Sequence, residues 1–133
     1  MQITATLSKL VSEALESTQS SGSLPAAGDV EIKIERPKLA EHGDFSTSLP
    51  LALARTMRMA PMQIAEAIAA AIPEHHMVGA VTHAAPGFVN FTLSTEWLQS
   101  QIDAVRSAGD DYGSVDVGAG QSVQVEFVSV NPT

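Results

Sequence analysis

The chain has 133 residues, a formal net charge of −8 and no cysteine. This length suits one domain, and an apolar content of 44% is enough for a packed core. The acidic balance excludes a general polyanion-binding domain, and the lack of cysteine excludes disulfides and thiolate metal sites. No apolar run approaches the roughly 20 residues that cross a bilayer, and no signal-peptide pattern is present. We therefore expect a cytoplasmic protein without a membrane segment.

The first third of the chain predicts one helix and one strand. Apolar residues recur at three-and-four spacing over residues 3–15, which indicates a helix, and the polar run at 17–23 predicts a loop. Residues 30–36 alternate apolar and charged side chains, a pattern typical of a strand with one buried face. Pro37 is expected to end this strand.

Two further helices are predicted in the middle of the chain. Asp44 or Ser46 can cap the first of them, provided that Pro50 falls in its first turn. The second is expected to begin near Pro61 and to stop at Pro73, because proline cannot continue a helix.

The clearest local signal is a β-hairpin. Residues 78–84 and 88–93 are both β-prone, and Ala85-Pro86-Gly87 forms a short turn sequence between them. Ser94 or Thr95 is expected to cap a following helix that stops at Gly109.

The last part of the chain predicts a linker and an isolated strand. Residues 109–121 are rich in Gly, Asp and Ser. Residues 123–130 carry apolar side chains on both faces, which is typical of a strand inside a parallel sheet covered on both sides. Because the sequence stops at Thr133, we expect it to be a piece of a longer protein.

The four histidines do not predict a metal site. His75 and His76 are adjacent and have no carboxylate partner at a recognisable ligand spacing, so we expect them to be exposed or to cap the helix end after Pro73. His83 is expected to be a half-exposed strand residue. His42 lies in a polar loop and could approach a ligand, although a loop role is favoured.

The second hairpin strand holds the most informative pair of side chains. Alternation places Val89, Phe91 and Leu93 on one face, and Phe88, Asn90 and Thr92 on the other. An exposed aromatic ring beside an amide can stack on a splayed nucleic-acid base and hydrogen-bond to its edge. The alternative is that Phe88 packs under a helix and Asn90 faces water, and the residues alone slightly favour it.

Four motifs occur in order and carry a family resemblance: ERPK at 35–38, EHGDFST at 41–47, APGFVNF at 85–91 and VEFVSVNPT at 125–133. Together they resemble the N-terminal region of bacterial arginyl-tRNA synthetases over nearly the whole chain. The resemblance implies an α+β fold, with a small antiparallel sheet packed by about four helices at 1–108. It also implies a linker at 109–121 and, at 122–133, the first strand of a Rossmann-type catalytic domain, just before the family's His-x-Gly-His signature.

The resemblance further implies a function. In the family this domain reads a D-loop base at the outer corner of the tRNA, and its aromatic and amide residues match Phe88 and Asn90. Residues that help shape the arginine pocket match Glu126, Ser129 and Asn131. The parent enzyme, expected to be a monomer, joins arginine to its tRNA with ATP and magnesium through arginyl-adenylate. This chain alone is expected to hold no cofactor and to be inactive. The alternative is a structural or protein-interaction domain that braces a larger enzyme without contacting RNA.

Overall fold

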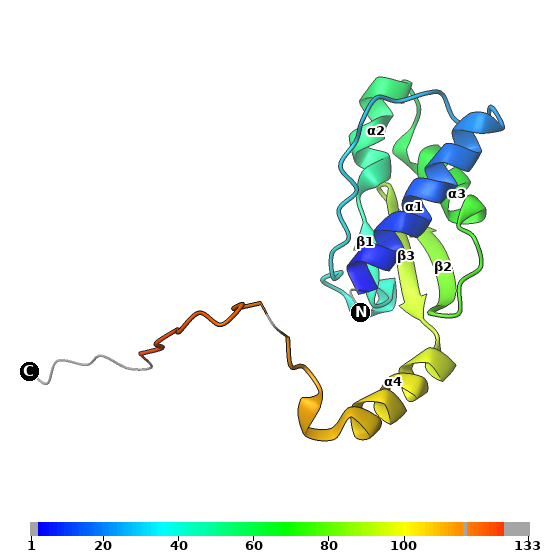
Figure 1. The fold of residues 1–133 in the computed structure, drawn as a ribbon. Helices are drawn as coiled ribbons and strands as arrows, with labels where there is room; N and C mark the ends of the chain where they lie inside the picture. The colour runs from blue at the N-terminus through cyan, green and yellow to red at the C-terminus, as the bar shows by residue number, and fades with distance from the viewer. Residues whose placement is uncertain (1–2, 116, 127–133) are drawn as a thin grey trace, which may run out of the picture.

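The computed structural model describes residues 3–115 and 117–126, and these residues form an α+β domain (Figure 1). Within this part of the chain, three strands form an antiparallel sheet in the order β1-β3-β2: β1 (Phe45–Thr47), β2 (Val78–Ala84) and β3 (Phe88–Leu93). The same residues include four α-helices: α1 (Ile3–Ser20), α2 (Leu49–Met57), α3 (Pro61–Ala71) and α4 (Thr95–Ala108). The predicted fold class and the predicted number of helices are confirmed.

The core lies between three of the helices and one face of the sheet. Helix α3 contacts β2, β3, α1 and α2, and α2 also contacts β3. On β3, Val89 and Phe91 are fully buried and Leu93 is nearly so, which confirms the predicted apolar face. The predicted hairpin is also confirmed, because Val81 pairs with Phe91 and Ala84 pairs with Phe88.

Helix α1 extends further than its apolar stripe. The prediction of a loop from residue 17 is wrong for the first part of that run, since the helix continues to Ser20. Thr18 lies in this extension: it is buried, and its hydroxyl donates to the carbonyl oxygens of Ala14 and Leu15 at 3.0 and 2.8 Å. A threonine that satisfies its hydroxyl on the preceding turn can be buried within a helix.

The prediction of a strand at residues 30–36 is wrong, although the predicted alternation of buried and exposed side chains is confirmed. Val30, Ile32 and Ile34 pack partly buried against the core, while the charged residues between them are exposed. This segment forms a single antiparallel bridge, in which Glu35 and Ser46 exchange backbone hydrogen bonds of 2.9 and 2.8 Å. The third strand of the sheet is instead β1.

The start of α2 also differs from the prediction. The helix begins at Leu49, with Ser48 at its N-cap position and Pro50 in its first turn. Neither Asp44 nor Ser46 caps it, because β1 lies between Asp44 and the helix and includes Ser46. Helix α3 begins at Pro61, as predicted, and ends two residues before Pro73.

Helix α4 leaves the end of the sheet and projects away from the other helices (Figure 1). Ser94 caps it, as predicted, by accepting a hydrogen bond from the Trp97 backbone N–H at 3.2 Å. The backbone N–H of Glu96, followed by the Ser94 hydroxyl, lowers the pKa of the Glu96 carboxyl below its usual value. The helix ends at Gly109, again as predicted.

The segment after α4 is exposed and has little regular structure. Beyond a single 3₁₀ turn (Gly109–Asp111), residues 112–115 and 117–126 contain no helix or strand. Of the strand predicted at 123–130, the first four residues are described and do not form one, and the remainder lies outside the described residues. No helix in the described part of the chain has the length and apolar character needed to cross a membrane.

Candidate nucleic-acid interface

A cavity of about 390 Å³ lies on the sheet face that carries Asn90. Three segments line it: the stretch before β1, β1 itself and the β2–β3 hairpin. The lining residues are Glu35, Arg36, Pro37, Lys38, Leu39, His42, Ser46, Ala84, Ala85, Phe88 and Asn90. Three of the four motifs that carry the resemblance therefore meet around one cavity.

Phe88 and Asn90, the two predicted tRNA-binding residues, both line this cavity. They stand two residues apart on β3, so their side chains lie on the same face of the sheet. Phe88 is half-buried. Asn90 is only 4% exposed, so the alternative in which it faces water is wrong. It lies between Ser46 on β1 and Thr82 on β2, and these neighbours help to cover it.

The side chain of Asn90 contains a buried polar atom that the fold leaves unsatisfied. Its Oδ1 has no hydrogen-bond partner among the described residues. Such an acceptor costs about 1–3 kcal/mol relative to one that is hydrogen-bonded. Half a turn of the terminal amide exchanges Oδ1 and Nδ2, so Asn90 can offer either an acceptor or a donor to a molecule in the cavity.

The hairpin turn holds Phe88 in place through a close approach to the start of α3. A Cβ atom on Gly87 would lie 2.5 Å from the Cβ of Pro61 and 3.2 Å from a methyl group of Leu51. Only glycine fits there without a shift of the neighbouring backbone. The Ala85–Pro86 peptide bond in this turn is cis. The turn predicted at Ala85-Pro86-Gly87 is confirmed, and it leads directly into Phe88.

Gly43 and Asp44 hold the segment before β1 against β3. Gly43 has φ +83°, and a Cβ there would lie 2.6 Å from the carbonyl oxygen of Phe91. Asp44 donates its backbone N–H to that same oxygen at 2.8 Å, and its Oδ2 accepts from the Leu93 N–H at 2.8 Å. The helix-cap role predicted for Asp44 is therefore replaced by a clamp between β1 and the end of β3.

The basic residues of the first motif also lie at the cavity. Arg36 and Lys38 line it from the segment before β1. The Arg36 guanidinium carbon lies 5.3 Å from the centre of the buried Phe45 ring, within the range of a cation–π contact. In the sequence these residues belong to a motif that carries the resemblance, and no role is predicted for them. The signal that could have identified them is a Lys/Arg pair flanking a proline in an otherwise acidic chain.

The four histidines differ in burial, and one of them lines the cavity. His76 is exposed, as predicted, whereas the half-buried His75 accepts the Met77 backbone N–H on its Nδ1 at 3.2 Å, a local bond in the loop beyond α3 that does not cap the helix. His83 is more exposed than predicted. His42 is half-buried and lines the cavity. Within the described residues, no cluster of three or more His, Asp or Glu side chains could hold a metal ion.

The three residues predicted to help bind arginine are not brought together in the part of the chain that the structure describes. Glu126 is exposed and belongs to no helix or strand, while Ser129 and Asn131 lie outside the described residues. They remain predictions from the sequence.

The chain is similar to known proteins over most of its length. Residues 5–93 match the family described as "Arginyl tRNA synthetase N terminal domain". The chain is 42% identical over 123 residues to the arginine–tRNA ligase of Dehalococcoides mccartyi and 40% identical over 127 residues to that of Thioalkalivibrio sulfidiphilus. These matches include 92% and 96% of this chain, but the chain spans only 22% of the length of each relative.

Solved structures agree on the fold. The Thermus thermophilus arginyl-tRNA synthetase superposes with a TM-score of 0.60 at 26% identity, over 75% of this chain and 15% of that one. The Plasmodium falciparum arginyl-tRNA synthetase gives a TM-score of 0.62 at 12% identity, over 75% of this chain and 17% of that one, and this second likeness concerns the fold alone. The matched residues and the shared architecture together place this chain in the family of arginyl-tRNA synthetase N-terminal domains.

Proposed function

We propose that this domain recognises an unpaired base of the tRNA D-loop, at the outer corner of the molecule, as part of an arginine–tRNA ligase. The observation that carries the proposal is the meeting of an aromatic residue, Phe88, and an amide residue, Asn90, at one cavity. A nucleobase can bind both residues, since its face stacks on an aromatic ring and its edge carries hydrogen-bond donors and acceptors for an amide.

The binding would combine stacking with hydrogen bonding. Stacking of one base on an aromatic side chain contributes about 1–3 kcal/mol. The Asn90 side chain is already largely removed from water by the fold, so a hydrogen bond between it and the base edge would cost little further desolvation of the protein. The half-buried Phe88 keeps part of its ring available to the cavity.

The activity of the whole protein is also part of this proposal, and the family to which the chain belongs supports it. The longer enzyme would attach arginine to its tRNA with ATP and magnesium through arginyl-adenylate, in the cytoplasm and as a monomer. Residues 1–108 would be the tRNA-contacting domain, 109–121 the linker and 122–133 the first strand of the catalytic domain. Glu126, Ser129 and Asn131 would contribute there to the arginine pocket.

A second function has an observation of its own. Helix α4 exposes an apolar stripe of Leu98, Ile102 and Val105, of which Ile102 is 60% exposed. Such a stripe favours a bracing or protein-interaction role for α4. This role and base recognition use different surfaces, since none of these three residues lines the cavity.

The test is aminoacylation by the full-length protein with Phe88→Ala. We expect kcat/KM for tRNA to fall by roughly 5- to 150-fold, the equivalent of one lost stacking contact, without loss of the fold. Thr92→Ala is the matched control, because Thr92 is an exposed residue on the same face of β3 and does not line the cavity. Equal charging by both variants would contradict base recognition and leave the bracing role.

A further inference from the structure

The cavity carries a charge distribution unlike that of the whole chain. The chain has 7 basic and 15 acidic residues, yet the formally charged residues that line the cavity are two cations, Arg36 and Lys38, and one carboxylate, Glu35. A stacked base needs no cation. Two cations beside it fit the other part of a nucleotide, its phosphate.

Neither cation has an ion-pair partner among the residues that the structure describes. The ion pairs among the described residues join Lys9 to Glu13, Lys33 to Glu31 and His42 to Glu41, so Arg36 and Lys38 form none. Both side chains are exposed at the rim of the cavity. Their charges are therefore available to an anion that reaches the rim.

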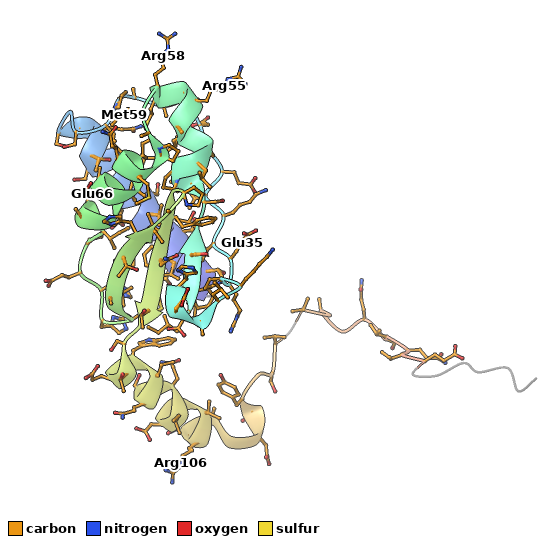
Figure 2. The ribbon with its side chains drawn as sticks, turned by 180° about the vertical axis from the view of Figure 1, so that it is seen from behind. Glu35, Arg55, Arg58, Met59, Glu66 and Arg106 are labelled. Atoms are coloured by element: carbon orange, nitrogen blue, oxygen red, sulfur yellow. The ribbon has the colours of Figure 1, made fainter. Side chains whose placement is uncertain are left out.

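The segment that carries them is held firmly against the sheet. Glu35 is bound to Ser46 by two backbone hydrogen bonds, which fixes it beside β1 at the sheet edge (Figure 2). Pro37 restricts the backbone of Arg36, and the buried Phe45 ring holds its guanidinium. A cation that is already positioned loses less side-chain entropy when it binds a phosphate.

We propose that Arg36 and Lys38 bind the phosphodiester groups that flank the base held by Phe88 and Asn90. This inference rests on the proposed function and deepens it: the cavity would take a nucleotide within an RNA chain, with its backbone along the rim, rather than a free base. It also shows how an acidic protein can hold RNA, since a local pair of cations substitutes for a basic surface.

The test is the salt dependence of tRNA binding by the full-length protein. Each phosphate contact contributes about 0.7–0.9 to the slope of log affinity against log salt concentration. For Arg36→Gln and Lys38→Gln we expect each slope to become shallower by that amount. The ratio of wild-type affinity to variant affinity for tRNA should then fall about threefold between about 50 and 200 mM salt.

Two variants serve as controls. Arg106→Gln removes an exposed cation at the far end of α4, away from the sheet, and should leave the slope unchanged (Figure 2). Arg36→Lys keeps the charge and should retain most of the slope, which separates a phosphate contact from a loss of folding.

A second readout separates this inference from the function on which it rests. Binding is also measured with tRNAs in which single D-loop positions are made abasic, using wild type and Phe88→Ala. If Phe88→Ala removes the abasic penalty but Arg36→Gln and Lys38→Gln keep the wild-type slope, the phosphate contacts are refuted and base recognition stands. If the slopes change but no abasic penalty exists, base recognition is refuted and the cations bind tRNA alone. Wild-type behaviour in all variants refutes both.

Discussion

The two faces of β3 are built from alternate residues of one six-residue strand, and they have different surroundings: one packs in the core and the other borders the cavity. On one face Val89 and Phe91 are fully buried among apolar neighbours from the helices. On the other, Phe88 and Asn90 border a cavity, and Asn90 carries a buried acceptor that forms no hydrogen bond with any described residue. The first arrangement minimises the free energy of the folded domain. The second gives up some of that free energy, because a buried acceptor has no hydrogen-bond partner among the described residues.

The largest expected effect is on the apolar face. Phe91→Ala removes a ring that is 0% exposed and pairs across the sheet with Phe45 and Val81. We expect it to lower the free energy of unfolding by about 3–5 kcal/mol, measured by chemical denaturation. Thr92→Ala, one residue further along the strand, should stay close to wild type. A small loss for Phe91→Ala would mean that the core does not depend on this face.

The second prediction separates the two faces most sharply. Asn90→Leu replaces a buried unsatisfied amide by an apolar side chain of similar size. We expect the free energy of unfolding to stay equal or to rise by up to about 1–3 kcal/mol, because an unpaired acceptor is removed. Aminoacylation by the full-length protein should nevertheless fall. A variant that is both less stable and fully active would show that Asn90 is structural.

The clamp between β1 and β3 should have an intermediate effect. Asp44→Ala leaves the Leu93 N–H without its carboxylate acceptor at 2.8 Å. We expect a loss of about 1.5–3 kcal/mol in the free energy of unfolding, the usual contribution of a hydrogen bond to a charged group. Thermal unfolding followed by circular dichroism measures it. If Asp44 capped α2 instead, Asp44→Ser would restore the stability, because serine is an equally good cap.

The smallest effect is expected where β3 passes into α4. Ser94→Ala removes the hydroxyl that accepts the Trp97 N–H, and the loss of such a cap costs about 1 kcal/mol. Thermal unfolding should detect this loss, while tRNA binding at the cavity should not change. Ser94→Asp, which keeps a capping oxygen, should recover most of the stability. A change in tRNA affinity in Ser94→Ala would mean that α4 is coupled to the cavity.

The elements that local sequence predicts well are those whose partners are close in the chain. The hairpin of β2 and β3 joins neighbouring β-prone runs across a three-residue turn, so its pairing depends on few residues. The capping of α4 by Ser94 and its end at Gly109 are likewise settled within one helical turn. The alternation of residues 30–36 correctly predicts which side chains are buried, but the strand that it predicts is absent. The same alternation arises in any extended segment that packs one face against a core, whether or not it pairs with a sheet.

By itself, the sequence determined the α+β fold class, the apolar face of β3 and the choice of Phe88 and Asn90 as a pair on one face. Only the tertiary structure decided that β1 completes the sheet, that Asp44 bonds to Leu93 across 49 positions, and that Asn90 is buried. It also brought Arg36 and Lys38 beside the hairpin. These outcomes depend on contacts between segments far apart in the chain, and the periodicity of a single segment carries no information about which distant segment will cover it.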